Sequence, residues 1–151
     1  MRVKKIFVFT IIFFFLVATS SLSPCLAQDE EALVTTIEIH PETLNLKSKG
    51  KWITCLVEAP DGYEVDDIVP KTVIISNVEG NVVNIEPVWW RIEDDEGGGM
   101  VLMLKYSRSE LQNVITQYSL KGEVEITVTG TLIDDTPFIG SDTIKVKGTK
   151  K

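Results

Sequence analysis

Cysteine and histidine residues that could form a nucleophile–base pair are few in this sequence. Its 151 residues include one histidine, His40, and two cysteines, Cys25 and Cys55. A catalytic thiol needs a base within reach, and His40 stands directly before Pro41, where we expect a turn at the end of a strand. Cys55 lies in a hydrophobic run typical of a buried strand, so we predict a small core residue. The sequence has no metal-ligand spacing and no glycine-rich phosphate loop, so we predict that the protein is not an enzyme.

Four consecutive acidic residues followed by three glycines form the most unusual polar segment. The acids are Glu93, Asp94, Asp95 and Glu96, and the glycines are residues 97–99. Carboxylates bind hard cations, so one hypothesis is a Ca²⁺ site built from these four side chains; we expect no other cofactor. Their spacing differs from that of a calcium loop, which places its ligands at alternate positions. The alternative is a solvated hairpin whose charges prevent edge-to-edge pairing of sheets.

Two adjacent aromatic residues, Trp89 and Trp90, precede Arg91. Successive side chains of a strand point to opposite faces, so we expect one indole in the core and the other at the surface. An exposed aromatic ring on a sandwich face can stack on sugar rings, which makes these three residues the candidate ligand-binding site. The alternative is that the outer ring packs beneath a helix or a loop. We place the third tryptophan, Trp52, in the core.

The first 27 residues have the three-part pattern of a secretory signal peptide. A short basic segment precedes the apolar run 6–18, and small residues stand before a cleavage position after Ala27. We therefore predict a secreted, periplasmic or cell-envelope protein. The alternative is an uncleaved membrane anchor, although the apolar run spans only about 20 Å of the roughly 30 Å hydrocarbon core.

The remaining residues, 28–151, are strongly acidic. These 124 residues contain 12 Lys and Arg against 22 Asp and Glu, a net charge of −10. Nucleic acids and anionic membrane surfaces bind basic surfaces, so we exclude both as partners of the chain after signal cleavage. The length suits one domain with a hydrophobic core and is too short for two ordinary ones.

Short runs rich in Val, Ile and Thr recur after residue 34 with turn sequences between them. This pattern is typical of β-strands. Val124, Ile126 and Val128 alternate with polar residues, which predicts a strand with one face in the core. We expect strands at residues 35–39, 44–46, 52–57, 72–76, 82–92, 100–105, 123–132 and 142–147.

Residues 107–116 differ from this strand pattern. Ser107 and Glu110 have the spacing of a capping box, and Leu111 and Ile115 share one helical face. We therefore predict a short crossover helix that packs on the sheets.

The predicted fold is all-β, an immunoglobulin-like β-sandwich of about eight strands with one short crossover helix. Residues 28–34 would form a flexible N-terminal tail, and residues 35–148 would form the domain.

Several segments are distinctive as a set. They are 44–55, 58–63, 103–108, 122–130 and 136–144. Together they resemble a recurrent immunoglobulin-like β-sandwich module of exported bacterial and archaeal proteins, which has no assigned activity. The resemblance covers nearly all of residues 36–147 and implies an exported, noncatalytic accessory or surface module.

These observations favour an exported noncatalytic module with a structural or protein-interaction role. Its partner would be a protein or a polysaccharide in the envelope or outside the cell. The alternatives are a carbohydrate-binding module that uses an exposed tryptophan and a calcium-stabilised surface module.

Overall fold

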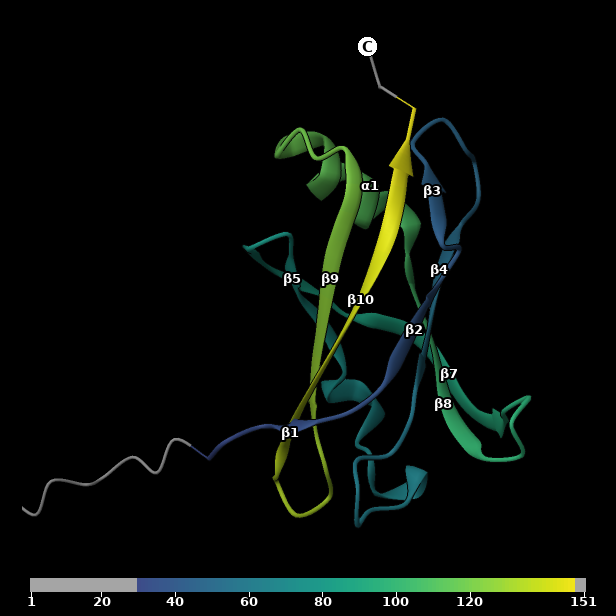
Figure 1. Cartoon of the computed structure of the whole chain (residues 1–151), viewed down its shortest axis with the longest axis vertical. Coiled ribbons are helices and arrows are strands. Elements are labelled where there is room, and N and C mark those ends of the chain that lie inside the picture. Colours follow the sequence, from purple (N-terminus) through teal and green to yellow (C-terminus); the bar gives the residue numbers. More distant parts are fainter. Residues whose placement is uncertain (1–29, 149–151) are drawn as a thin grey trace, which may run out of the picture.

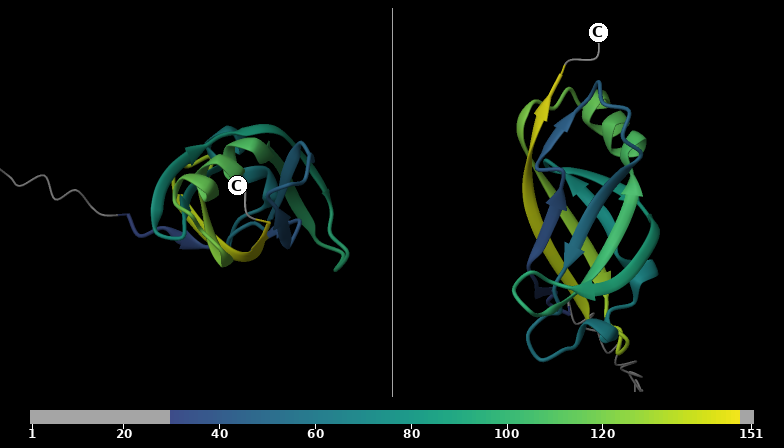
Figure 2. Two further views of the ribbon diagram at one scale, coloured as in Figure 1. Left: turned by 90° about the horizontal axis from the view of Figure 1, so that it is seen from above. Right: turned by 90° about the vertical axis from the view of Figure 1, so that its right-hand side faces the viewer.

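The computed structural model describes residues 30–148, which form an all-β sandwich of ten strands in two sheets (Figure 1). One α-helix within these residues covers an end of the sandwich (Figure 2). The prediction of an all-β sandwich with one short helix is confirmed. The predicted signal peptide lies outside the described residues. Across residues 30–148, no helix has the length and apolar character needed to cross a membrane.

The larger sheet, sheet A, has six strands. They run in the order β1, β10, β9, β5 and β6, and β3 pairs with β10 beside this path. Their bounds are β1 Leu33–Val34, β3 Thr43–Asn45, β5 Ile74–Val78, β6 Asn81–Ile85, β9 Gly122–Thr131 and β10 Pro137–Lys147. The inward-facing residues Val124, Ile126 and Val128 of β9 are buried in the core, so the predicted alternation is confirmed.

The smaller sheet, sheet B, has four strands in the order β2, β4, β8 and β7. Their bounds are β2 Ile37–His40, β4 Trp52–Val57, β7 Pro87–Asp94 and β8 Met100–Ser107, and the short 3₁₀ helices η1 Val65–Asp67 and η2 Pro70–Thr72 connect β4 to β5. Tyr106 on β8 is fully buried, and its hydroxyl donates a hydrogen bond to the carbonyl of Val73 at 2.9 Å. This bond ties sheet B to the segment that leads into sheet A.

The N-terminal segment crosses from sheet A to sheet B and back again. β1 pairs with Phe138 and Ile139 of β10, the chain then enters sheet B as β2, and it returns to β10 as β3. Gly140 permits this close crossing, because a Cβ at that position would lie 2.6 Å from Cγ2 of Ile37.

Helix α1, Arg108–Gln117, lies where β8 ends and β9 begins. The hydroxyl of Ser107 accepts a hydrogen bond from the backbone N–H of Glu110 at 3.4 Å, which confirms the predicted N-cap. Leu111 and Ile115 are fully buried, so the predicted apolar face packs on the sheets. We call this end of the sandwich, where β3 and β10 also end, the α1 end (Figure 2).

Three local predictions differ from the structure. The predicted strand 82–92 is two strands in different sheets, β6 and β7, because the chain leaves sheet A just before Pro87, which lacks an amide hydrogen. The predicted tail 28–34 ends in strand β1, which pairs with β10. The last strand begins at Pro137 and not at residue 142, because β9 and β1 supply partners for its first half.

Candidate functional site

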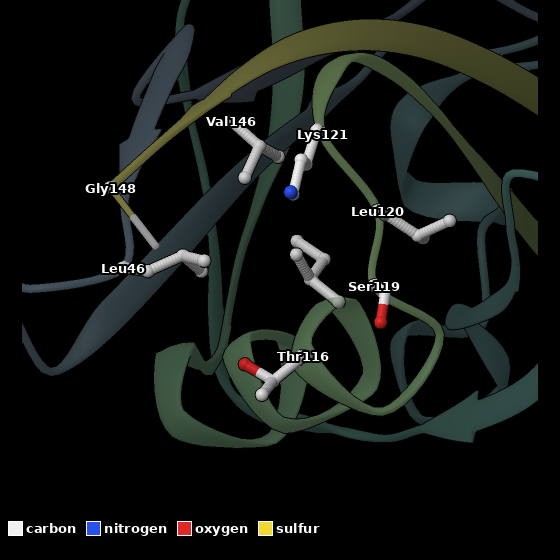
Figure 3. A pocket seen from close by; sticks show the side chains of 8 residues that line it. Leu46, Thr116, Ser119, Leu120, Lys121, Val146 and Gly148 are labelled. Carbon is white, nitrogen blue, oxygen red and sulfur yellow. The ribbon is translucent and has the colours of Figure 1, made fainter. Parts of the chain in front are cut away.

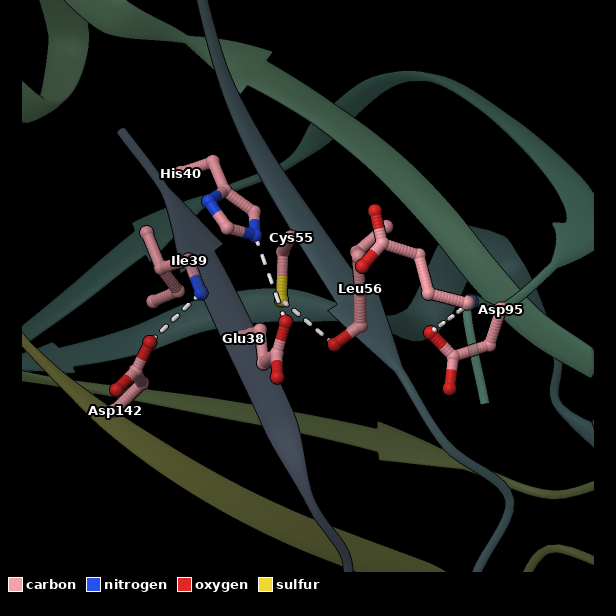
Figure 4. A network of polar contacts seen from close by, with 8 residues as sticks. Glu38, Ile39, His40, Cys55, Leu56, Asp95 and Asp142 are labelled. Atoms are coloured by element: carbon pink, nitrogen blue, oxygen red, sulfur yellow. Dashed lines mark hydrogen bonds and ion pairs between the residues drawn. The ribbon is translucent and has the colours of Figure 1, made fainter. Parts of the chain in front are cut away.

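Cys55 and His40 lie on opposite faces of sheet B. Cys55 is fully buried, as predicted, and burial together with the nearby charge of Asp142 raises the pKa of its thiol far above its usual range. His40 is on the outer face, where its Nε2 lies 3.5 Å from the carboxylate of Glu38 (Figure 4). The arrangement keeps the thiol protonated and away from the imidazole, so the two side chains do not form a nucleophile–base pair.

The carboxylate of Asp142 has a structural role, because each of its oxygens accepts a hydrogen bond from the backbone. One carboxylate oxygen accepts the backbone N–H of Ile39 at 2.7 Å (Figure 4). The other accepts the backbone N–H of Thr143 at 2.8 Å. Both oxygens are therefore occupied, one within β10 and the other in a bond that joins β10 to β2.

The four consecutive acids separate along the β7–β8 hairpin. Glu93 forms an ion pair with Arg91, with 2.8 Å between its carboxylate and a terminal guanidinium nitrogen. The Asp95 carboxylate accepts the backbone N–H of Glu96 at 2.8 Å. Asp94 is the last residue of β7. Two of the four proposed calcium ligands thus already have partners in the chain.

An open acidic recess of about 600 Å³ lies beside this hairpin. Residues 93–97 form one wall, and Glu38, His40 and Leu56 form the other. Within the part of the chain that the structure describes, no three His, Cys, Asp or Glu side chains are grouped so that they could hold a metal ion. The recess is a negatively charged margin of sheet B.

The candidate residues Trp89, Trp90 and Arg91 divide between two faces, as the alternation predicts. Trp90 is half-buried and packs against the core. Trp89 points outward and is 42% exposed. The Arg91 guanidinium lies 5.4 Å and the Lys105 ammonium 5.5 Å from the centroid of the Trp89 ring. The structure therefore brings Trp89 and Arg91 together and separates Trp90 from them.

The prediction that Trp52 belongs to the core is wrong. Trp52 is 42% exposed on the outer face of β4, opposite Ser107 of β8. Its neighbours Ile53 and Cys55 point inward, and strict alternation then directs Trp52 outward. The alternation along residues 52–57 is visible in the sequence and could have placed Trp52 correctly. Trp52 thus adds a second tryptophan to the surface that carries Trp89.

We define the sheet B face as the outward-facing residues of β2, β4, β7 and β8. They are Glu38, His40, Trp52, Thr54, Leu56, Trp89, Arg91, Glu93, Val101, Met103 and Lys105. Met103 lies at the centre, opposite Leu56 of β4 on one side and Arg91 of β7 on the other.

The outer face of sheet A has a different composition. The outward-facing residues of β9 and β10 include Glu123, Glu125, Thr127, Thr129, Ser141, Thr143 and Lys145. Hydroxyl and charged side chains cover this face, whereas aromatic, apolar and guanidinium groups gather on the sheet B face.

A separate pocket of about 260 Å³ lies at the α1 end (Figure 3). Leu46, Ile115, Leu120 and Val146 give it an apolar lining, and Lys121 stands at its edge. Its walls come from α1, the segment after α1 and the end of β10, so its shape depends on how the helix caps the sandwich.

No protein-family model, curated protein or solved structure matches this chain. We therefore infer function from the arrangement of side chains alone. The described residues offer a mixed aromatic and cationic surface that suits binding, with the buried thiol and the exposed imidazole held apart.

Proposed function

We propose that this protein is an exported, noncatalytic binding module that recognises a protein partner through the sheet B face. The observation that supports this proposal is the composition of that face, where Trp52, Trp89, Met103 and Arg91 gather. Aromatic residues, methionine and arginine are enriched in the cores of protein–protein interfaces relative to other surfaces. Export rests on the signal-peptide pattern of residues 1–27.

Trp89 is the residue best placed to dominate the binding energy. It exposes a large apolar ring, and Arg91 and Lys105 lie within about the distance at which cations are attracted to an indole. The ion pair with Glu93 also holds Arg91 in place. A side chain that is already ordered loses less entropy on binding, which favours affinity.

The charge of the surroundings indicates the chemistry of the partner. The acidic recess borders the sheet B face at the β7–β8 hairpin. A partner with basic residues at the rim of its interface would be attracted to this margin, and such complementarity mainly accelerates association. We therefore propose a partner with an apolar centre and a basic rim.

A polysaccharide is the second candidate, because two exposed indoles share one face. Trp52 and Trp89 belong to strands on either side of β8 and are offset by two residues, which places their Cα atoms about 12 Å apart. An extended glycan could contact both rings. The cations beside Trp89 compete for its ring, and for this reason we favour the protein partner.

The test is affinity capture from the envelope fraction with the exported chain, its Trp89→Ala variant and a Thr127→Ala control on sheet A. We expect one protein to bind the wild type and the control and to bind W89A at least about thirtyfold more weakly, since an interface tryptophan often contributes 2 kcal/mol or more. Equal capture by all three chains would contradict the proposal. Tryptophan fluorescence that changes with a polysaccharide, without any captured protein, would support the second candidate instead.

A further inference from the structure

Strand β7 is a free edge of sheet B. The sheet ends with this strand, Pro87–Asp94, and β8 is its one partner strand among the described residues. In an antiparallel ladder, about every second residue directs its N–H and C=O groups away from the partner strand. No backbone hydrogen bond within residues 30–148 reaches these groups of β7, and η2, which lies near the strand, forms none with it. The edge can therefore accept one more strand.

β7 also exposes apolar side chains on both sides of the sheet. Val88, Trp89 and Ile92 are all exposed. Trp89 belongs to the outer face, whereas Ile92 pairs with the buried Leu102 of β8 and so belongs to the inner face. Soluble proteins usually protect an edge strand with charges, proline or a bulge. In β7 the proline and the bulge precede Trp89 and the acids lie at the end, so Arg91 is the one charge in the middle.

The other edge strands of the described residues are shorter or tied to a neighbour. β2, at the opposite edge of sheet B, has four residues, and the N–H of its Ile39 donates to Asp142 of β10. β6, an edge of sheet A, has five residues, with Val82 as its one exposed large hydrophobic side chain. β7 has eight residues, and the β7–β8 hairpin projects from the body of the sandwich (Figure 1). β7 is therefore the edge best suited to pairing with another chain.

We propose that β7 pairs with β7 of a second copy of this chain, antiparallel and about a two-fold axis close to Trp90. A two-fold axis perpendicular to the sheet brings the same surface of both copies together and joins residues of the same face. Centred on Trp90, it places Trp89 beside Arg91 of the second copy, twice, and Ile92 beside Val88 of the second copy. The two copies of sheet B then form one continuous sheet of eight strands.

The side chains favour this register over its neighbours. Arg91 lies 5.4 Å from the ring centroid of its own Trp89, and the pairing gives each guanidinium a second indole across the strands. A two-fold axis on Arg91 would instead place two guanidinium groups opposite each other. One on Ile92 would place Asp94 opposite the tryptophan that packs against the core. In the proposed register the acids Glu86 and Asp94 meet only at the two open ends, where salt screens their repulsion.

The first test is the oligomeric state of the purified exported chain, with no other protein present. Sedimentation velocity from micromolar to millimolar concentration should show a monomer that becomes a dimer. Ile92→Lys adds a charge to the paired edge and should raise the Kd of the dimer at least about tenfold. Val82→Lys makes the same kind of change on the edge strand β6 and should leave the Kd unchanged. A monomer at every concentration, or equal effects of the two variants, would overturn the proposal.

A distance measurement tests the register without changing the paired edge. Met100 is exposed on β8 and pairs with Asp94 of β7. With nitroxide labels on Met100→Cys and the buried Cys55 unlabelled, the two Cα positions should be about 30 Å apart. A two-fold axis on Ile92 would give about 20 Å, and that result, or no coupling between the labels, would overturn the proposed pairing. The measurement stays informative even if I92K does not fold.

The dimer does not rest on the partner proposed for the sheet B face. Ile92 belongs to the inner face, so I92K leaves Trp89 and the other outward-facing residues unchanged. Sedimentation of the purified chain reports on the dimer, and capture by I92K reports on the partner. The two proposals therefore fail separately.

Discussion

The carboxylate of Asp142 on β10 accepts the backbone N–H of Ile39 on β2 at 2.7 Å, across the boundary between the two sheets. β10 is paired with β1 before this point and with β3 after it, and β2 between them belongs to the other sheet. Before and after this crossing, backbone carbonyls of β10 accept the N–H groups of the N-terminal segment. At the crossing itself, the side chain of Asp142 is the acceptor.

Replacing Asp142 should weaken this crossing. In Asp142→Asn one of the two accepting oxygens becomes an amide NH₂, so either Ile39 or Thr143 loses its acceptor. We expect the free energy of unfolding to fall by about 1–3 kcal/mol, measured by urea denaturation. Asp66→Asn, at an exposed position in η1, is the matched control and should stay within about 0.5 kcal/mol of the wild type. Equal effects of the two substitutions would contradict this role of Asp142.

Substitution of Gly140 should lower stability by a similar amount, for a steric reason. An added Cβ would lie 2.6 Å from Ile37 Cγ2 and 2.9 Å from the carbonyl oxygen of Thr35. We expect Gly140→Ala to lower the free energy of unfolding by about 1–3 kcal/mol. Gly99→Ala is the control, because a Cβ there meets no atom within 4 Å. An unchanged denaturation midpoint for G140A would show that the crossing has room for a methyl group.

Asp134 should make stability depend on pH in the acid range. Hydrogen bonds from Thr136 and then from the Tyr63 hydroxyl, 2.9 Å away, lower the pKa of this carboxyl. A lowered folded-state pKa contributes stability above the unfolded value of about 3.9, and this contribution is lost as pH falls through the lower folded value. We expect Asp134→Asn to be less stable than the wild type at pH 6, with the difference shrinking below pH about 4. A difference in Tm that stays constant from pH 6 to pH 2 would contradict this account.

The thiol of Cys55 should be protected in the folded chain. It is fully buried, and burial raises its pKa, so the reactive thiolate does not form in the folded state. In a Cys25→Ser chain, where Cys55 is the one remaining cysteine, we expect modification by a thiol reagent at pH 8 to be slower than in denaturant by a factor on the order of 10³, since local or global opening must come first. Rapid modification under native conditions would show that β4 is accessible.

Local sequence patterns predict the strands and the helix well where one face is buried. Val124, Ile126 and Val128 alternate as expected, and the Ser107 cap begins α1 at the expected place. The pairing of β1 with β10 and the change of sheet at Pro87 were missed, because both depend on partners distant in the sequence.

The candidate sites were likewise predictable only where they depend on local sequence. Alternation separates Trp89 from Trp90 and could also have placed Trp52 outside. The free edge of β7 has no local signal, because it arises from the order of the four strands in sheet B. The grouping of Met103 with Leu56 and Arg91 likewise requires the register of three strands.

The most direct test of the sheet B face as a recognition surface is site-specific photocrosslinking in the native envelope. A photoreactive residue at position 103 lies at the centre of this face, and one at position 127 lies on the outer face of sheet A. We expect position 103 to crosslink to a distinct protein, position 127 to give no such product, and W89A to reduce the product at position 103 at least about tenfold. Crosslinks from position 127 alone, or a product at position 103 that is unaffected by W89A, would contradict the central claim.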